Sequence, residues 1–475
     1  MTKTILRALL TGVVCVTAIL PWDSKIHSGI IHAALMCIPP EDRIQQRWGD
    51  EVWRLQEYVQ LGDWVNALAN EQEAWNVGGQ TLTQAGVQFY ANDYLIFPGS
   101  PRPIQHSVPD VKATYEPFFR RALQALRTES PANAARWTGS LLHFVTDSGS
   151  PPHTIGVKGE EHTKMESWLD TSLIDLNAYQ PRMLGATEDT AIEGLLRRMD
   201  ALIAFSAVRG RELLPLVKVN DRAHMEPIAL ESAAETARVA ADVIHTLLQL
   251  SKYSAPIAQA GLIADITAPE IKGMENLPAK LMVLGTEYST LSEQSLPGFH
   301  AYRGVFSLRN LPPGQYRIAI ERVGSQTLYL PTLILKPSET LHASWKLQSS
   351  EVPGNLAPNP DLSLHWVASN APDHWHYEGS KHEWISDNIP VVSGKNYHVG
   401  CELKAGATSE VELQWMAHAW EAMRIPALPF DLSNRRHVDI TIPAPSGAIF
   451  VRFIVQSQED PSTLLQRVFV APEHP

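Results

Sequence analysis

The sequence predicts a multidomain protein in which an all-α N-terminal domain is followed by two all-β, sandwich-like domains. Three observations lead to this prediction. The chain has 475 residues, which is too long for one ordinary hydrophobic core. Apolar residues recur at helical spacing from about residue 26 to 255. After Pro256 they alternate with polar residues, as is typical of strands.

The first 21 residues have the composition of a secretory signal peptide. Lys3 and Arg7 precede an apolar run from Ala8 to Leu20. This run is shorter than the ~20 apolar residues that a membrane-spanning helix needs. An uncleaved membrane anchor is the alternative interpretation. We therefore expect segment 1–21 to direct the protein to a secreted, periplasmic or extracellular location.

The charge balance and the cysteines restrict the classes of function. The formal net charge is -12, from 39 basic and 51 acidic residues. This argues against a broad nucleic-acid-binding surface, which needs a basic stripe. It does not exclude a small anionic substrate, because bound metal supplies positive charge locally. Outside the signal segment only Cys37 and Cys401 remain, so a disulfide framework is not expected.

A helical domain is expected at 22–255. The second of its predicted helices opens with Pro131, which suits a first turn, and ends at Gly149 ahead of a Pro-Pro pair. We find no convincing strand in this half of the chain. The predicted helices are 110–129, 131–149, 191–206 and 231–250.

The two β domains are expected at 262–348 and 355–475, with the break EVPGNLAPNPD between them. In QYRIAIERV, Tyr316, Ile318 and Ile320 share one face of a strand. The first β domain resembles a transthyretin-like or carboxypeptidase-regulatory sandwich through NLPPGQYRIAIE. The second resembles a carbohydrate-binding jelly roll through PVVSGKNYHV. Its tryptophans are either platforms for a glycan or membrane or, more commonly, half-buried core: Trp375, Trp384, Trp415 and Trp420.

The strongest chemical signal is the segment LLHFVTDSGSPPHTIGVKGEEHTKMESWLD. His143 and Asp147 are four residues apart on a predicted helix and so project from one face. His162 and Glu166 repeat this spacing on the next helix, and His153 lies between the two pairs. Imidazoles and carboxylates clustered in this way are ligands that zinc accepts.

This segment resembles the zinc-dependent phospholipase C family of the alpha-toxin type, to which the single-strand-specific zinc nucleases are related. The family pattern is LH-[YF]-x-G-D-x-x-x-P-x-H followed by H-x-x-x-[ED]. The present chain has LHFVTDSGSPPH and then HTKME, with Thr146 in place of the usual Gly. The resemblance covers about residues 22–250 and implies an all-helical fold with three zinc ions.

Further zinc ligands follow from the resemblance alone. The family begins at a Trp whose amino group and carbonyl oxygen bind zinc, which selects Trp22. A phospholipase-like spacing of ten residues then selects His32 as ligand, whereas the five-residue spacing of the nucleases selects His27. We favour His32, because HAAL matches the phospholipase context. Asp93 and His106 match an Asp–His pair of the family.

The resemblance distributes these residues over three zinc ions. One zinc is assigned Asp93, His106, His143 and Asp147, and a second is assigned His153, His162 and Glu166. The third is assigned Trp22, His32 and the bridging Asp147. Asp93 is the candidate catalytic residue that orients or deprotonates the attacking water. Tyr94, beside it, is a candidate substrate contact.

The resulting hypothesis is a secreted zinc-dependent phospholipase C that hydrolyses the glycerol-side phosphodiester of phospholipids such as phosphatidylcholine. Its substrate would be a phospholipid or membrane surface, and the β domains would contact glycan or membrane. A single-strand-specific zinc nuclease acting on nucleic acid is the first alternative. A surface-binding protein with purely structural zinc is the second.

Overall fold

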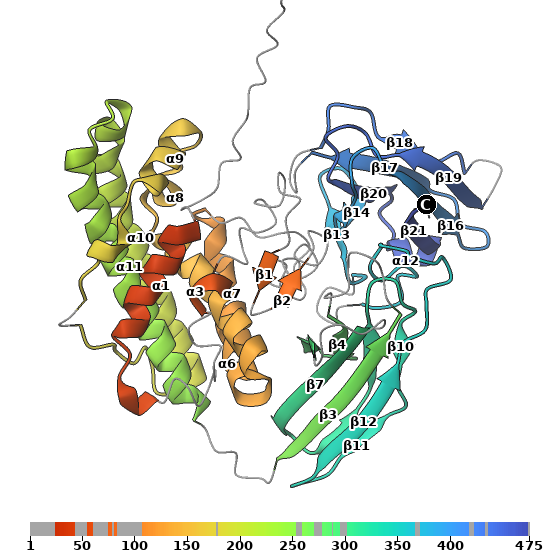
Figure 1. The fold of residues 1–475 in the computed structure, drawn as a ribbon, viewed down its shortest axis with the longest axis horizontal. Helices are drawn as coiled ribbons and strands as arrows, with labels where there is room; N and C mark the ends of the chain where they lie inside the picture. Colours follow the sequence, from red (N-terminus) through yellow and green to blue (C-terminus); the bar gives the residue numbers. More distant parts are fainter. Residues whose placement is uncertain are drawn as a thin grey trace, which may run out of the picture.

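The computed structural model consists of a helical N-terminal region followed by β sheets, which confirms the predicted fold class (Figure 1). The helices and sheets lie on opposite sides of the view. The structure describes residues 24–42, 55–59, 75–77, 80–82, 107–176, 179–252, 259–269, 278–286, 288–294, 302–365, 371–417, 422–432 and 436–473.

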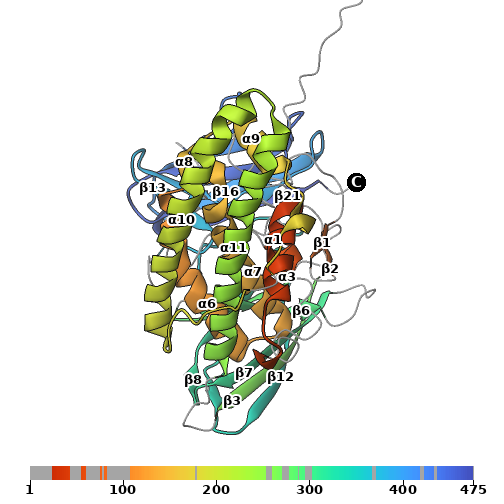
Figure 2. The same ribbon diagram turned by 90° about the vertical axis from the view of Figure 1, so that its left-hand side faces the viewer.

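The helical region is a bundle in which α7 is the central helix. Every α7 residue from Asn133 to Gly149 is buried. The helix contacts α1, α3, α6, α10 and α11, and the last two lie side by side along the bundle (Figures 1 and 2). The helices, with three short 3₁₀ segments, are α1 Ser24–Met36, η1 Pro40–Asp42, α3 Leu55–Tyr58, η4 Asp110–Thr114, α6 Tyr115–Thr128, α7 Pro131–Gly149, α8 Pro151–Ile155, α9 Glu160–Ser167, η5 Thr171–Leu173, α10 Glu188–Lys218 and α11 Arg222–Ser251.

Local sequence explains where these helices begin and end. The Ser130 side chain caps α7 by accepting a hydrogen bond from the backbone N–H of Asn133, and Pro131 follows in the first turn. Helix α7 therefore has the predicted bounds. Helices α10 and α11 extend beyond the predicted segments. Pro215 lies near the C-terminal end of α10, and Pro227 lies near the N-terminal end of α11.

A two-stranded hairpin in the helical half was not predicted. Strand β1 (Trp75–Val77) pairs antiparallel with β2 (Gln80–Leu82). The intervening sequence, Gly-Gly, is a recognised signal for a two-residue hairpin connection. Each strand has only three residues, which is too few for an alternation of apolar and polar residues to indicate a strand.

The first β region is a sandwich of two four-stranded sheets, ordered β12-β3-β7-β6 and β10-β9-β4-β5, with the pair β11-β8 beside them. Alternate residues of β3, including Leu262, Ala264 and Ile266, enter a core that both larger sheets share. The strands are β3 Ala260–Ala268, β4 Lys280–Val283, β5 Ser289–Leu291, β6 Glu293–Gln294, β7 Tyr302–Leu311, β8 Gly314–Tyr316, β9 Ile318–Glu321, β10 Leu328–Tyr329, β11 Leu333–Leu335 and β12 Thr340–Lys346.

The second β region has a six-stranded sheet, β13-β14-β20-β17-β18 with β15 on β20, and a three-stranded sheet, β19-β16-β21. Trp375, Trp384 and Trp415 are at most 9% exposed, so they belong to its core and are not surface platforms. Trp420 lies outside the described residues. The elements are β13 Trp375–Glu378, β14 Glu383–Ser386, β15 Ile389–Pro390, β16 Asn396–Leu403, β17 Glu410–Met416, β18 Leu428–Pro429, β19 His437–Pro443, β20 Phe450–Gln456, α12 Pro461–Leu464 and β21 Leu465–Pro472.

The segment QYRIAIERV is not the single alternating strand that the sequence predicted. The chain leaves β8 at Tyr316 and enters β9, in a different sheet, at Ile318. All four residues of β9 are buried. Ile318 and Ile320 face the sandwich core, whereas Ala319 packs against Leu364 of the second β region. Both faces of β9 are therefore covered.

A buried ionic cluster joins the two β regions. Lys280 and Glu321 lie opposite each other on β4 and β9. Lys280 Nζ is 2.9 Å from Asp373 Oδ2, and His374 Nε2 is 3.0 Å from Glu321 Oε1. His374 Nδ1 is 2.9 Å from Asp387 Oδ2. His374 adopts a φ of 68°, which few non-glycine residues do.

The charges in this cluster are matched to one another. Burial alone lowers the pKa of His374, but Asp373 and Glu321 outweigh it and hold that pKa well above 6.5. Burial raises the pKa of Asp373, and His374 and Lys280 outweigh it and lower that pKa to about 2. A raised imidazole pKa stabilises the fold fully below the unfolded-state value of about 6.5. This contribution is lost as the pH rises through the folded-state pKa.

A second polar interface joins the start of α7 to the first β region. Asn133 donates to the carbonyl of Leu291, and Arg136 pairs with Glu293 at 3.1 Å. Nearby, Arg121 pairs with Glu129 and stacks over the Trp137 ring at 4.4 Å. The first β region is therefore fixed to the helix that runs through the centre of the bundle.

Among the residues described, none of the helices has the length and apolar character that crossing a bilayer requires.

We predict that His374→Asn lowers the free energy of unfolding by about 3–5 kcal/mol at pH 7, because it leaves buried carboxylates without their imidazolium. Asparagine tolerates the positive φ, so the backbone is not the cause. His382→Asn is the matched control, since His382 also has a positive φ, 59°, and is exposed. Denaturant unfolding followed by tryptophan fluorescence measures both. Equal effects of the two substitutions would refute an ionic role for His374.

We also predict that the His374 ring keeps both of its protons at pH 7.5, where an ordinary histidine is mostly neutral. Nitrogen chemical shifts of histidine-labelled protein, assigned with the His374→Asn variant, report this state directly. A neutral His374 ring at pH 7.5 would show that the carboxylates around it do not raise its pKa.

Candidate metal centre

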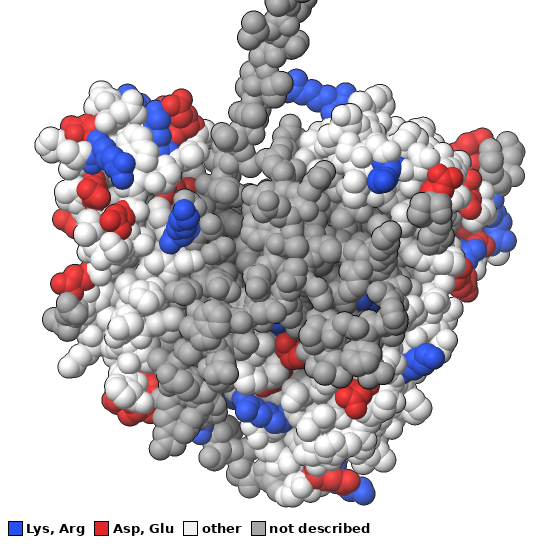
Figure 3. Space-filling view, viewed as in Figure 1, with Lys and Arg blue, Asp and Glu red and all other residues white. Residues whose placement is uncertain are grey.

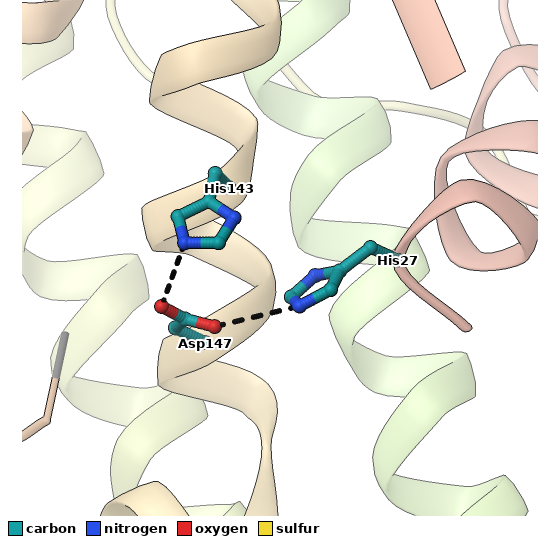
Figure 4. A group of neighbouring side chains, drawn as sticks. All are labelled: His27, His143 and Asp147. Atoms are coloured by element: carbon teal, nitrogen blue, oxygen red, sulfur yellow. Dashed lines mark ion pairs between the residues drawn. The ribbon is translucent and has the colours of Figure 1, made fainter. Parts of the chain in front are cut away.

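The C-terminal half of α7 presents one imidazole and one carboxylate on the same face. His143 Nε2 is 3.1 Å from Asp147 Oδ2, one helical turn away. His27 reaches the same carboxylate from α1, with its Nε2 3.6 Å from Asp147 Oδ1. All three side chains are fully buried. Figure 4 shows the two rings on either side of the Asp147 carboxylate.

The backbone fixes the tautomer of His143. Its Nδ1 is 2.9 Å from the carbonyl oxygen of Val59. A carbonyl only accepts hydrogen bonds, so Nδ1 carries the proton. In the neutral ring the Nε2 lone pair then points toward Asp147. An imidazole held by its far nitrogen in this way is the usual arrangement of a metal-binding histidine.

His27 is neutral near pH 7. Burial is the main cause, and together with the neighbouring His143 it lowers the pKa of His27 to about 3. The opposing effect of Asp147 is smaller. His27 Nδ1 lies 2.6 Å from the hydroxyl oxygen of Thr146. A buried, uncharged imidazole is the form that binds a metal ion.

A second group of the same composition lies on α8 and α9. Glu166 lies between two imidazoles, 3.2 Å from His153 Nε2 and 2.8 Å from His162 Nε2. His162 Nδ1 is 2.8 Å from the carbonyl oxygen of Val157, which again places the proton on Nδ1. Ser150 donates a hydrogen bond to Glu166 Oε1 at 2.6 Å.

Glu166 is ionised despite its burial. Burial alone raises its pKa, but His153 and His162 outweigh this and lower it to about 2. The charges of Glu166 and His153 also influence the pKa of His27. Ser150, three residues after Asp147, donates to Glu166, so the second group adjoins the end of the helix that carries the first.

The residues present fit a zinc site. Each group offers two imidazole nitrogens and one carboxylate oxygen, and the ligand atoms within a group lie within 4.8 Å of one another. Zinc accepts this donor set, and three protein ligands leave a position for water or substrate. Each carboxylate is buried beside two imidazoles, where a bound cation would compensate for its charge.

The structure brings together five of the residues that the sequence singled out. His143 and Asp147 lie in the first group, and His153, His162 and Glu166 form the second. Four other candidates, Trp22, Asp93, Tyr94 and His106, lie outside the described residues.

His32, the histidine of α1 that the sequence favoured, does not lie in either group. His32 is on the exposed face of α1, whereas His27 is buried beside His143 and Asp147. Five residues turn a helix by about 500°, so the two histidines cannot share a face. The buried side of α1 is marked by Ile26, Ile30 and Ala34, and this apolar spacing is a signal from which sequence reasoning could have chosen His27.

A third cluster with metal-type donors was missed by sequence reasoning, because its members come from distant segments. In Glu321, Asp373 and His374 the possible ligand atoms also lie within 4.8 Å of one another. Here, however, Lys280 and the protonated His374 already supply positive charge. We interpret this cluster as an ionic contact between the β regions.

The chain was compared with known proteins. No family model matches it, and no curated protein matches it. Solved structures similar to it include the alpha-toxin of Clostridium absonum, at 11% identity and a TM-score of 0.35, over 69% of this chain and 96% of the toxin. Clostridium perfringens alpha-toxin from the avian strain SWCP is similar at 13% identity and a TM-score of 0.26, over 70% of this chain and 98% of the toxin.

A putative carbohydrate-binding protein of Bacteroides uniformis is similar at 12% identity and a TM-score of 0.12, over 40% of this chain and 78% of that one. At these scores and identities the likenesses carry no argument about activity. The function is therefore argued from the site itself.

We predict that His27→Ala lowers the zinc content of the purified protein, whereas His32→Ala leaves it unchanged. The loss of zinc affinity should be larger than the roughly 10–100-fold loss caused by substituting residues that contact a ligand but not the metal. The two variants carry the same substitution on the same helix, and elemental analysis after dialysis measures both. The opposite ranking would return the ligand role to His32.

Proposed function

We propose that the helical region is a zinc-dependent phosphodiester hydrolase, and specifically a phospholipase C. The observation that supports this most is the pair of neighbouring buried groups, each with two imidazoles and a carboxylate. In His143 and His162 a backbone carbonyl holds the far ring nitrogen, and the near nitrogen faces the carboxylate of its own group, as in a metal site whose outer partners orient the ligands.

The chemistry of a phosphodiester matches what this site offers. The substrate is anionic and repels hydroxide, so hydrolysis needs a nucleophile at neutral pH and positive charge on the phosphate. Bound zinc supplies both, because it lowers the pKa of its water to about 7 and neutralises phosphate oxygens. The protein residues hold this site in position and keep it buried.

The proposed ligands come from the two described groups and from the sequence resemblance. His27, His143 and Asp147 form one described group, and His153, His162 and Glu166 form the other. By the sequence resemblance, Trp22 joins the first group, with His27 in place of His32. The resemblance also adds Asp93 and His106, with Asp93 orienting the attacking water and Tyr94 contacting the substrate.

Two features favour a phospholipid over a nucleic acid. The net charge is -12, and on the described part of the face in Figure 3 acidic and basic side chains are interspersed. A nucleic-acid surface needs a basic stripe. In the resemblance, the last ligand position holds Glu166, whereas the nucleases usually have Asp there, and this also favours a phospholipase.

One observation favours the second candidate, a single-strand-specific nuclease. The buried histidine of α1 is His27, which follows Trp22 by five residues, and this is the nuclease-like spacing. Both candidates use the same zinc ligands. The two substrates therefore have to be compared directly on one preparation.

We predict that the purified protein releases phosphocholine from phosphatidylcholine in mixed micelles, and that a zinc chelator abolishes this release. His162→Ala should reduce the rate by at least about 100-fold, because it removes a metal ligand. His224→Ala, an exposed histidine on α11, is the control and should retain the rate.

Single-stranded DNA is assayed in parallel. Chelator-sensitive cleavage of DNA without release of phosphocholine would replace the phospholipase by the nuclease. Zinc-loaded protein that is inactive on phosphatidylcholine, other phospholipids and DNA would leave the metal with a structural role and overturn the proposal.

A further inference from the structure

Thr146 lies on α7, three residues after His143 and immediately before Asp147. It contacts a third proposed ligand, His27, across the bundle. Its hydroxyl oxygen is 2.6 Å from His27 Nδ1. Thr146 and His27 are both fully buried, and they come from α7 and α1. The family pattern has Gly at this position, so this contact belongs to the present sequence.

The hydrogen bonds of the Thr146 hydroxyl indicate which atom donates in its contact with His27. The hydroxyl has one proton, and its oxygen lies 2.8 Å from the carbonyl of His143 and 3.0 Å from that of Leu142. Carbonyls only accept, so the hydroxyl donates to the helix backbone, as buried threonines in helices commonly do. The oxygen is then left to accept a hydrogen bond from His27 Nδ1.

The other side of the His27 ring faces the Asp147 carboxylate. Its Nε2 is 3.6 Å from Asp147 Oδ1, too long for a hydrogen bond between these two atoms. A proton on Nδ1 leaves the Nε2 lone pair directed toward Asp147. This is the state that binds a metal ion.

We propose that Thr146 is a positioning residue that fixes the Nδ1-protonated tautomer and the orientation of His27, so that Nε2 is presented as a metal ligand. In His143 and His162 a backbone carbonyl does this, from Val59 and Val157. In His27 a side chain does it, and substitution can therefore test the role. The inference rests on the proposed metal function.

The test uses three full-length variants. Thr146→Val keeps the shape and removes the hydroxyl, and Thr146→Ser restores the hydroxyl. Thr138→Val is the matched control on the same helix. Thr138 is also fully buried, and its hydroxyl donates to the carbonyl of Ala134, four residues earlier, at 2.8 Å.

The first readout needs no metal. Nitrogen chemical shifts of histidine-labelled, zinc-free protein at pH 7.5, assigned with His27→Ala, report the tautomer of His27. We expect the Nδ1-protonated form in the wild type, Thr146→Ser and Thr138→Val, and a mixture or the Nε2-protonated form in Thr146→Val. A wild-type His27 protonated on Nε2 would overturn the proposal.

The second readout is zinc affinity, measured by competition with a chromogenic chelator. Thr146→Val should weaken binding by about 10–100-fold, which is the usual cost of losing an outer-shell partner. Thr146→Ser and Thr138→Val should bind as the wild type does. Unchanged affinity in Thr146→Val would also overturn the proposal.

The two readouts separate this inference from the proposed function. If the wild type binds no zinc, the metal function fails, and the tautomer measurement still decides whether Thr146 controls His27. If the wild type binds zinc and Thr146→Val matches it in both readouts, only the role of Thr146 fails. Should Thr146→Val unfold, the serine variant and the wild-type tautomer still test the assignment.

Discussion

The carboxylate of Asp147 sits in the middle of a helical bundle, with no exposure to water. An anion in such a place is costly unless opposite charge or hydrogen bonds compensate for it. The nearest imidazoles are His143 and His27, and His27 is uncharged near neutral pH. The Asp147 carboxylate therefore lies where a bound cation would compensate for its charge.

Much of the surrounding structure serves to hold this arrangement. Helix α7 is buried along almost its whole length, so a change in its position would disturb every helix that packs on it. At one end it carries His143 and Asp147. At the other, Asn133 and Arg136 tie it to the first β region. The site and the interface are thus two ends of one rigid element.

The parts of this structure that sequence reasoning found are those set by local spacing. Helical periodicity and the Ser-Pro start gave the bounds of α7, and four-residue spacing gave the two His–carboxylate pairs. The preference for His32 over His27 relied on a motif count rather than on which side of α1 is apolar, and in the structure His27 is the buried histidine. The cluster at His374 was not foreseeable, because it joins residues far apart in sequence whose proximity depends on the packing of two sheets.

The polar interface at the start of α7 also bears on how this chain can be divided. The composition changes near residue 256, which marks a natural place to separate a helical half from a β-sheet half. Interactions between the two halves cross this point. Arg136 forms an ion pair with Glu293, and Asn133 donates a hydrogen bond to the carbonyl of Leu291, and both partners lie after residue 256. A truncation that ends at the last helix would keep the proposed ligands and remove the partners that anchor the helix carrying them.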